Sequence, residues 1–141
     1  MNHTIVLGVG PGELENPKHY LIPNSLINRI FARAEVQSAI RQGCASNTFP
    51  DIERLARLGV DNIEFYGVWE DKCVIASVYH ALELGMNAKV PKGFTMPYPS
   101  EGGSLIDSAK RYESKSKFKI RIIEDDEYTY FSVRNKFLWI F

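Results

Sequence analysis

One succession of segments in the middle of the chain constrains the fold more than any other. Residues 63–68 are rich in apolar and aromatic side chains, and after a short turn residues 71–84 carry apolar positions at helical spacing up to Gly85. Residues 87–90 can then form another short strand. Strand, helix and strand that follow one another with almost no linker predict a right-handed crossover in a parallel sheet.

The same alternation occurs on either side of this unit. Residues 4–7 form a short apolar run that stops at a glycine-rich stretch, as a buried strand entering a loop does. The chain is therefore predicted to have an α/β fold, a three-layer, Rossmann-like, mostly parallel sheet with helices on both faces. Helices are predicted over residues 24–34, 51–58 and 104–112, the last opened by a capping box at Ser104, whereas residues 35–47 carry no readable pattern.

The C-terminal part departs from the alternation. Residues 117–122 alternate charged and apolar side chains, which predicts a half-exposed strand at an edge of the sheet. Residues 128–133 and 137–141 follow an acidic turn and predict an antiparallel hairpin joined near Arg134. Because residues 137–141 are all apolar, we expect them to pack on the core or on another copy of the chain. This hairpin predicts a homo-oligomer.

Composition bounds the class of protein. With 141 residues the chain is predicted to be one domain, residues 1–141, with an α/β core over 1–123 and the hairpin extension over 124–141. Its 17 Lys and Arg balance its 17 Asp and Glu, which argues against nucleic-acid binding by bulk charge. No apolar run approaches the ~20 residues of a membrane helix and no secretory leader is visible, so a cytoplasmic protein without membrane partners is expected.

Cys73 is the residue that physical chemistry singles out. The stretch Gly67-Val-Trp-Glu-Asp-Lys-Cys-Val74 places it in the first turn of a helix, just past the end of a strand. Ligands bind at that edge of an open α/β sheet. The N–H groups and the dipole at a helix start lower the pKa of a thiol and can hold an oxyanion. The alternative is that Cys73 is a small buried hydrophobic residue.

The segment 49–90 resembles the isochorismatase-like cysteine hydrolases, a family that includes nicotinamidases and isochorismatase itself. The resemblance rests on Leu58-Gly-Val-Asp-Asn-Ile63, on the Gly67-Val-Trp-Glu-Asp-Lys-Cys-Val74 motif and on Ala81-Leu-Glu-Leu-Gly85. It covers about a third of the chain. It implies that Cys73 is the nucleophile and that a non-proline cis peptide between Val68 and Trp69 helps to build an oxyanion hole with the backbone N–H of Cys73.

Other family features are changed or missing in this chain. Family members have an Asp general base after the first strand, whereas here the nearest carboxylates are Glu13 and Glu15, which are more simply explained as solvated loop residues. Glu13 is the candidate replacement for the base. The family also has a Lys near the position of Arg41, which could stabilise a thiolate but cannot exchange a proton as Lys does.

Three aromatic residues, Tyr66, Trp69 and Tyr98, could line a small apolar pocket that stacks a planar ring such as pyridine or adenine. The histidines have no metal-ligand spacing, so neither a metal nor another cofactor is predicted. The run Gly8-Val-Gly-Pro-Gly12 is also similar to the glycine-rich opening of tetrapyrrole methyltransferases, but this similarity covers one pentapeptide. A tight turn explains these glycines more simply.

The sequence leaves two functions open. The first is hydrolysis of an amide, or of a related C–N or ether-type bond, by Cys73 as nucleophile. The second is a catalytically degenerate family member that binds a small metabolite or nucleotide, or serves as an assembly subunit, without turnover. The missing Asp favours the second function, and the motif around Cys73 favours the first.

Overall fold

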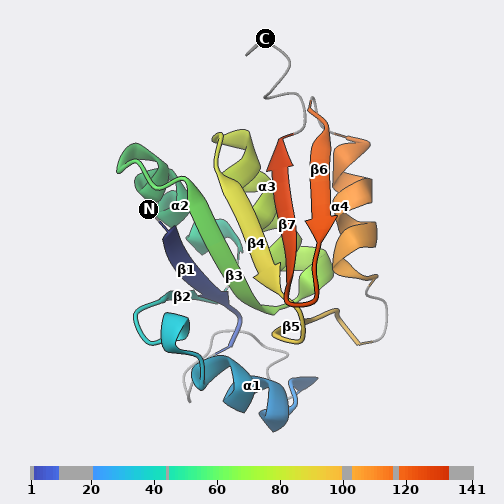
Figure 1. Cartoon of the computed structure of the whole chain (residues 1–141). Helices are drawn as coiled ribbons and strands as arrows, with labels where there is room; N and C mark the ends of the chain where they lie inside the picture. Colours follow the sequence, from blue (N-terminus) through green and yellow to red (C-terminus); the bar gives the residue numbers. More distant parts are fainter. Residues whose placement is uncertain (1, 10–20, 44, 100–102, 116–117, 134–141) are drawn as a thin grey trace.

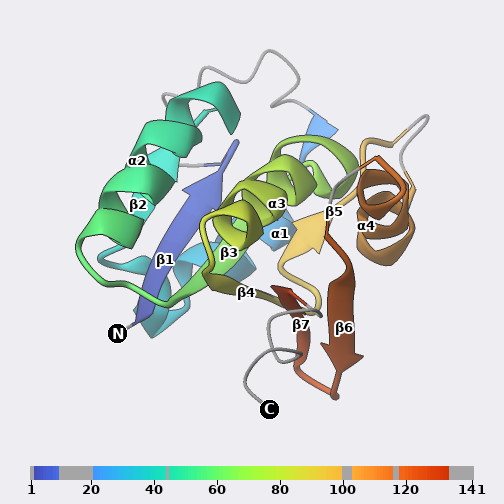
Figure 2. The ribbon, with the colours of Figure 1, turned by 90° about the horizontal axis from the view of Figure 1, so that it is seen from above.

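The chain forms one mixed sheet with helices on both faces, which confirms the α/β class (Figures 1 and 2). The structure, a computed structural model, describes residues 2–9, 21–43, 45–99, 103–115 and 118–133. In this part of the chain the strands are β1 (Asn2–Leu7), β2 (Ile40–Gln42), β3 (Asn62–Val68), β4 (Asn87–Pro91), β5 (Thr95–Met96), β6 (Ile120–Glu124) and β7 (Tyr128–Val133). The helical elements are α1 (Asn24–Phe31), η2 (Ala34–Val36), α2 (Ala45–Arg57), η3 (Glu70–Val74), α3 (Ile75–Glu83) and α4 (Leu105–Glu113).

The strand order is β2-β1-β3-β4-β7-β6, with the short β5 beside the end of β3. The strands β2, β1, β3 and β4 pair in parallel, as the alternating pattern predicts, and β5 is also parallel to β3. The last two strands are antiparallel, β7 to β4 and β6 to β7. The sheet is therefore mixed, and the expectation of a mostly parallel sheet holds for its first part only.

The prediction of a hairpin between residues 128–133 and 137–141 is wrong, because residues 128–133 pair with the strand before them. The hairpin consists of β6 and β7, and its turn is closed by Asp125, whose Oδ1 accepts from the backbone N–H groups of Glu127 and Tyr128 at 2.8 and 2.7 Å. Because β7 has β4 on one side and β6 on the other, it has no edge left for residues 137–141. Residues 134–141 lie outside the described residues. The edge position expected for the preceding strand is correct, since β6 ends the sheet.

Several helix boundaries also differ from the sequence patterns. Helix α2 begins at Ala45, five residues before Pro50, so that the proline lies inside the helix. The helix predicted over residues 71–84 is divided into the π-helical turn η3 and the regular helix α3. The cap of α4 is as predicted, because Ser104 Oγ accepts from the backbone N–H of Asp107 at 3.1 Å. None of the helices in the described ranges is long and apolar enough to cross a membrane.

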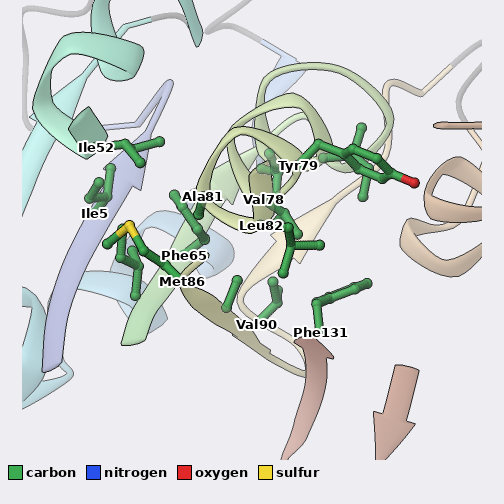
Figure 3. Close-up of a cluster of buried hydrophobic side chains, with 14 of the residues drawn as sticks. Ile5, Ile52, Phe65, Val78, Tyr79, Ala81, Leu82, Met86, Val90 and Phe131 are labelled. Carbon is green, nitrogen blue, oxygen red and sulfur yellow. The ribbon is translucent and has the colours of Figure 1, made fainter. Parts of the chain in front are cut away.

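The sheet separates two buried cores, and β3 contributes to both of them. Phe65 joins the larger core under α2, α3 and α4, whereas Tyr66 points to the other face and belongs to the core under α1. Figure 3 shows the larger core, where Val78 and Leu82 of α3 lie over strand residues that include Phe65. Since β3 is covered on both faces, packing fixes the place where the chain leaves the sheet and enters η3.

Candidate functional site

Cys73 lies in the turn that immediately follows β3, at the edge of the sheet where parallel strands end. The peptide bond between Val68 and Trp69 is cis, at the position that the family resemblance implies. The Trp69 carbonyl then accepts from the backbone N–H groups of Lys72 and Val74 at 3.0 and 3.1 Å, which closes the turn. Cys73 is a reduced cysteine with a partly exposed side chain. The motif therefore presents a thiol at the edge where ligands bind in α/β sheets.

Two carboxylates of the same turn hold the segment that follows β4. The hydroxyl of Thr95 donates to Glu70 Oε1 at 2.7 Å, and the backbone N–H of Tyr98 donates to Asp71 Oδ1 at 3.1 Å. The backbone N–H of Gly67 also donates to the carbonyl of Phe94 at 3.1 Å. Residues 94–98 are therefore fixed beside the cysteine motif by backbone and side-chain bonds together.

The three aromatic residues predicted to form a pocket belong to one buried cluster under α1. The rings of Trp69 and Tyr98 are in edge-to-face contact, with centroids 5.2 Å apart, and Lys72 Nζ lies 5.5 Å from the Tyr98 ring. Tyr66 is completely buried, and its hydroxyl donates to Glu64 Oε2 at 2.7 Å. The structure therefore brings Trp69 and Tyr98 together at the site, whereas Tyr66 has no exposed ring surface with which to stack a ligand.

The structure places one of the other two predicted catalytic residues, Arg41, on the sheet face that α1 covers. Arg41 is in register with Val6, on the face that α1 covers, and its guanidinium lies 4.9 Å from the Phe31 ring centroid. The next residue, Gln42, donates instead to Asp51 Oδ2 of α2 at 2.6 Å. Arg41 thus lies on the sheet face away from α3. Glu13 lies outside the described residues.

Glu70 is a residue of the site that sequence reasoning missed. Its carboxyl group accepts from the Thr95 hydroxyl and the Leu105 backbone N–H, so it joins η3 to β5 and α4. It also lines a cavity of about 280 Å³ together with Lys92 and Ser104. Burial raises the pKa of Glu70. No local pattern indicates this role, because Thr95 is 25 residues further along the chain.

We expect Glu70→Gln to change how stability depends on pH. The pKa of Glu70 is raised from its ordinary value of 4.5, so ionisation costs more in the folded state than in the unfolded chain. The native protein should therefore be most stable relative to the Glu70→Gln variant below about pH 4.5, and should lose this advantage as pH rises through the raised pKa. Urea unfolding of both proteins from about pH 4 to about pH 8 measures the difference.

Glu83→Gln, at an exposed position of α3, is the matched control for the loss of one carboxylate. If the stability of Glu70→Gln relative to the native protein falls, rather than rises, with increasing pH, the assigned direction of the Glu70 shift is wrong.

The chain matches no protein-family model, no curated protein and no solved structure. Among the described residues, no group of three or more His, Cys, Asp or Glu side chains is arranged to hold a metal ion. What the site can do chemically follows from its own geometry. It combines a partly exposed thiol at a helix start, an aromatic pair and a half-buried carboxyl group at the edge of the sheet where the parallel strands end.

Proposed function

We propose that the chain is a small, divergent isochorismatase-like hydrolase with a Rossmann-like core, in which Cys73 attacks an amide or a related bond of a small molecule. The observation that carries this proposal is the position of the Cys73 thiol, partly exposed in the turn after β3 at the ends of the parallel strands. A structural cysteine of the core needs no exposure and no such position. The contacts of Glu70 and Asp71 with residues 95–98 support the proposal, because they fix the surroundings of the thiol.

The reaction proceeds by two displacements at one carbonyl carbon. The Cys73 thiolate forms a bond from Sγ to the carbonyl carbon, and the C–N bond then breaks as the amine leaves with a proton. Water attacks the resulting thioester, releases the carboxylic acid and returns the thiol. Backbone N–H groups where the helix begins favour both the thiolate and the oxyanion. The proton acceptor in this scheme is a carboxylate, with Glu13 of the glycine-rich loop as the sequence-based candidate.

Alkylation of Cys73 by iodoacetamide tests the nucleophile. In a Cys44→Ser background, which leaves one thiol, we expect alkylation at neutral pH at least about threefold faster than that of N-acetylcysteine, because a lowered pKa increases the thiolate fraction. Intact-mass spectrometry follows the reaction, and Cys73→Ser in the same background is the control for reaction at other groups. A rate at or below that of N-acetylcysteine would contradict an activated thiol at this position.

Binding without turnover is the second candidate, and one observation favours it. After β1 the described chain continues with Gly8 and Val9, so no carboxylate stands directly at the end of this strand. A panel of small amides that includes nicotinamide separates the two functions. Hydrolysis that Cys73→Ala abolishes contradicts the binding-only function, whereas a reactive Cys73 with no turnover of any amide in the panel favours it.

A further inference from the structure

A groove of about 510 Å³ lies on the sheet face that α1 leaves open. It extends from the starts of β3 and β4 across β7 to β6. In the described part of the chain, α2, α3 and α4 cover the opposite face, and α1 packs near the carboxyl ends of β1 and β3 (Figures 1 and 2). The volume of the groove is within the range of sites that hold small organic molecules.

One wall of the groove is a row of large side chains on neighbouring strands. Lys89 of β4 is opposite Tyr130 of β7, which in turn is opposite Ile123 of β6. Cross-strand neighbours on one face lie close enough to touch, so these three side chains form a continuous ridge. Ile123 is 49% exposed although it is a large apolar residue. The ridge therefore offers an apolar surface that ends in a cation.

The adjacent row consists of smaller polar residues, which explains why the sheet is hollowed here. Asn62 of β3 is opposite Asn87 of β4, and Ser132 of β7 is opposite Arg121 of β6. The amides and the hydroxyl are short, whereas Arg121 is long and exposed at the outer strand. The hollow is thus bounded by the Lys89 ridge on one side and by Arg121 at its outer end.

The groove carries positive charge and no carboxylate lines it within the described residues. Among the residues that the structure describes, Arg121 has no partner in an ion pair or a hydrogen bond. Lys89 Nζ is 4.0 Å from Glu64 Oε1 and 4.4 Å from the Tyr128 ring centroid, so its charge is only partly compensated. A ligand that fits this surface needs an apolar body and a negative group.

We propose that this groove binds a small apolar molecule that carries one anionic group, a carboxylate or a sulfonate. The apolar body contacts Ile123 and Tyr130, and the anionic group is attracted by Arg121 and Lys89. The site is separate from Cys73, which does not line it, and its ligand is independent of the proposed hydrolysis.

The fluorescent probe 8-anilinonaphthalene-1-sulfonate has this chemistry, and its binding to the full chain tests the proposal. We expect one bound probe per chain, an affinity that falls about fivefold in Arg121→Gln, and a similar loss in Ile123→Ser. Arg57→Gln removes a cation from the exposed side of α2 and is the matched control, with a change below about twofold. The neutral probe N-phenyl-1-naphthylamine should respond to Ile123→Ser but not to Arg121→Gln. Thermal unfolding confirms that each variant is folded.

Three results would overturn the proposal. Arg121→Gln and Arg57→Gln could weaken binding of the sulfonate probe equally, which would indicate that the overall charge of the chain attracts the probe. A chain without residues 134–141 could bind the probe about tenfold more tightly than the full chain, which would make those residues the occupant of the groove. Light scattering could show a dimer that Ile123→Ser dissociates, which would make a second copy the occupant.

Discussion

Replacing Gly67 with alanine is expected to lower the free energy of unfolding by about 3 kcal/mol or more, because the new methyl group has no space and the backbone is unsuitable for it. A Cβ atom at this position would lie 1.9 Å from the carbonyl oxygen of Leu7, far inside van der Waals contact. Gly67 also has a φ of +108°, a conformation that residues with a side chain rarely adopt. The steric clash and the backbone conformation therefore both destabilise the Gly67→Ala variant.

The clash cannot be relieved by a side-chain rotation, because the atom it meets belongs to the backbone. Leu7 and Gly67 are paired neighbours in β1 and β3, two strands inside the sheet, and β1 has β2 on its other side. A shift of Leu7 would move β1 away from both of its neighbours. The change would also displace the turn that carries Cys73, because Gly67 is the second-last residue of β3.

Gly85→Ala is the matched control for the backbone effect alone. Gly85 has a φ of +82°, and a Cβ atom there would have no heavy atom within 4 Å. Its replacement should cost about 1–2 kcal/mol, the usual penalty for a left-handed conformation with a side chain. Urea unfolding measures both variants. Equal losses of unfolding free energy in Gly67→Ala and Gly85→Ala would contradict this expectation, because they would show that the Leu7 carbonyl moves to make room for the methyl group.

The parts of the fold that local sequence patterns predict correctly are those whose cause is local. β3 is a short, mostly buried run, and β4 is a short strand that begins two residues after Gly85. Helix α4 begins at a Ser104 cap that bonds to a residue three positions later. β2 was not predictable in this way, because it has three residues, none of them buried, and depends on its pairing with β1. The position of β7 between β4 and β6 is likewise decided by pairing between distant segments.

The same distinction explains the outcome for the site. The motif around Cys73 is contiguous in sequence, so the position of the thiol after a strand could be predicted. Glu70 and Thr95 are 25 residues apart, and Arg33 and Tyr66 are 33 apart, so neither contact follows from spacing. Arg41 was assigned from its place in the chain, but the alternation of side chains along β2 directs it to the face of α1.

The second large effect is expected from the buried carboxylate of β3. Glu64 is only 6% exposed, and it is the acceptor for the hydroxyl groups of Tyr66 at 2.7 Å and Tyr128 at 3.4 Å. Arg33 Nη2 and Lys89 Nζ lie 3.9 and 4.0 Å from its oxygens. Replacing Glu64 with Gln keeps the shape of the side chain and removes the negative charge with which these four groups interact.

We expect Glu64→Gln to lower the free energy of unfolding by about 2 kcal/mol. Removing one partner of a fully buried ion pair costs about 3–5 kcal/mol, because the other charge stays buried. Here the side chains of Arg33 and Lys89 are 31% and 32% exposed, so both can turn towards water and the loss is smaller. The Tyr66 hydroxyl cannot do so, since its residue is completely buried.

A double-mutant cycle with Tyr66→Phe separates the hydrogen bond from the rest of the network. Burial and the hydrogen bond to Glu64 both raise the pKa of Tyr66, so its hydroxyl remains a proton donor at neutral pH. We expect a coupling free energy of about 1.5 kcal/mol between Glu64 and Tyr66 in urea unfolding. A coupling near zero would mean that the charge of Glu64 is stabilised by its cations and not by the phenol.

Glu53→Gln provides the comparison with a carboxylate contact at the surface. Glu53 Oε2 lies 2.8 Å from His80 Nε2, a shorter contact than either cation makes with Glu64, but the Glu53 side chain is 44% exposed. Water can replace the partner of an exposed carboxylate, so the substitution should cost less than about 1 kcal/mol. A larger loss in Glu53→Gln than in Glu64→Gln would show that contact distance, rather than burial, decides how much each carboxylate stabilises this fold.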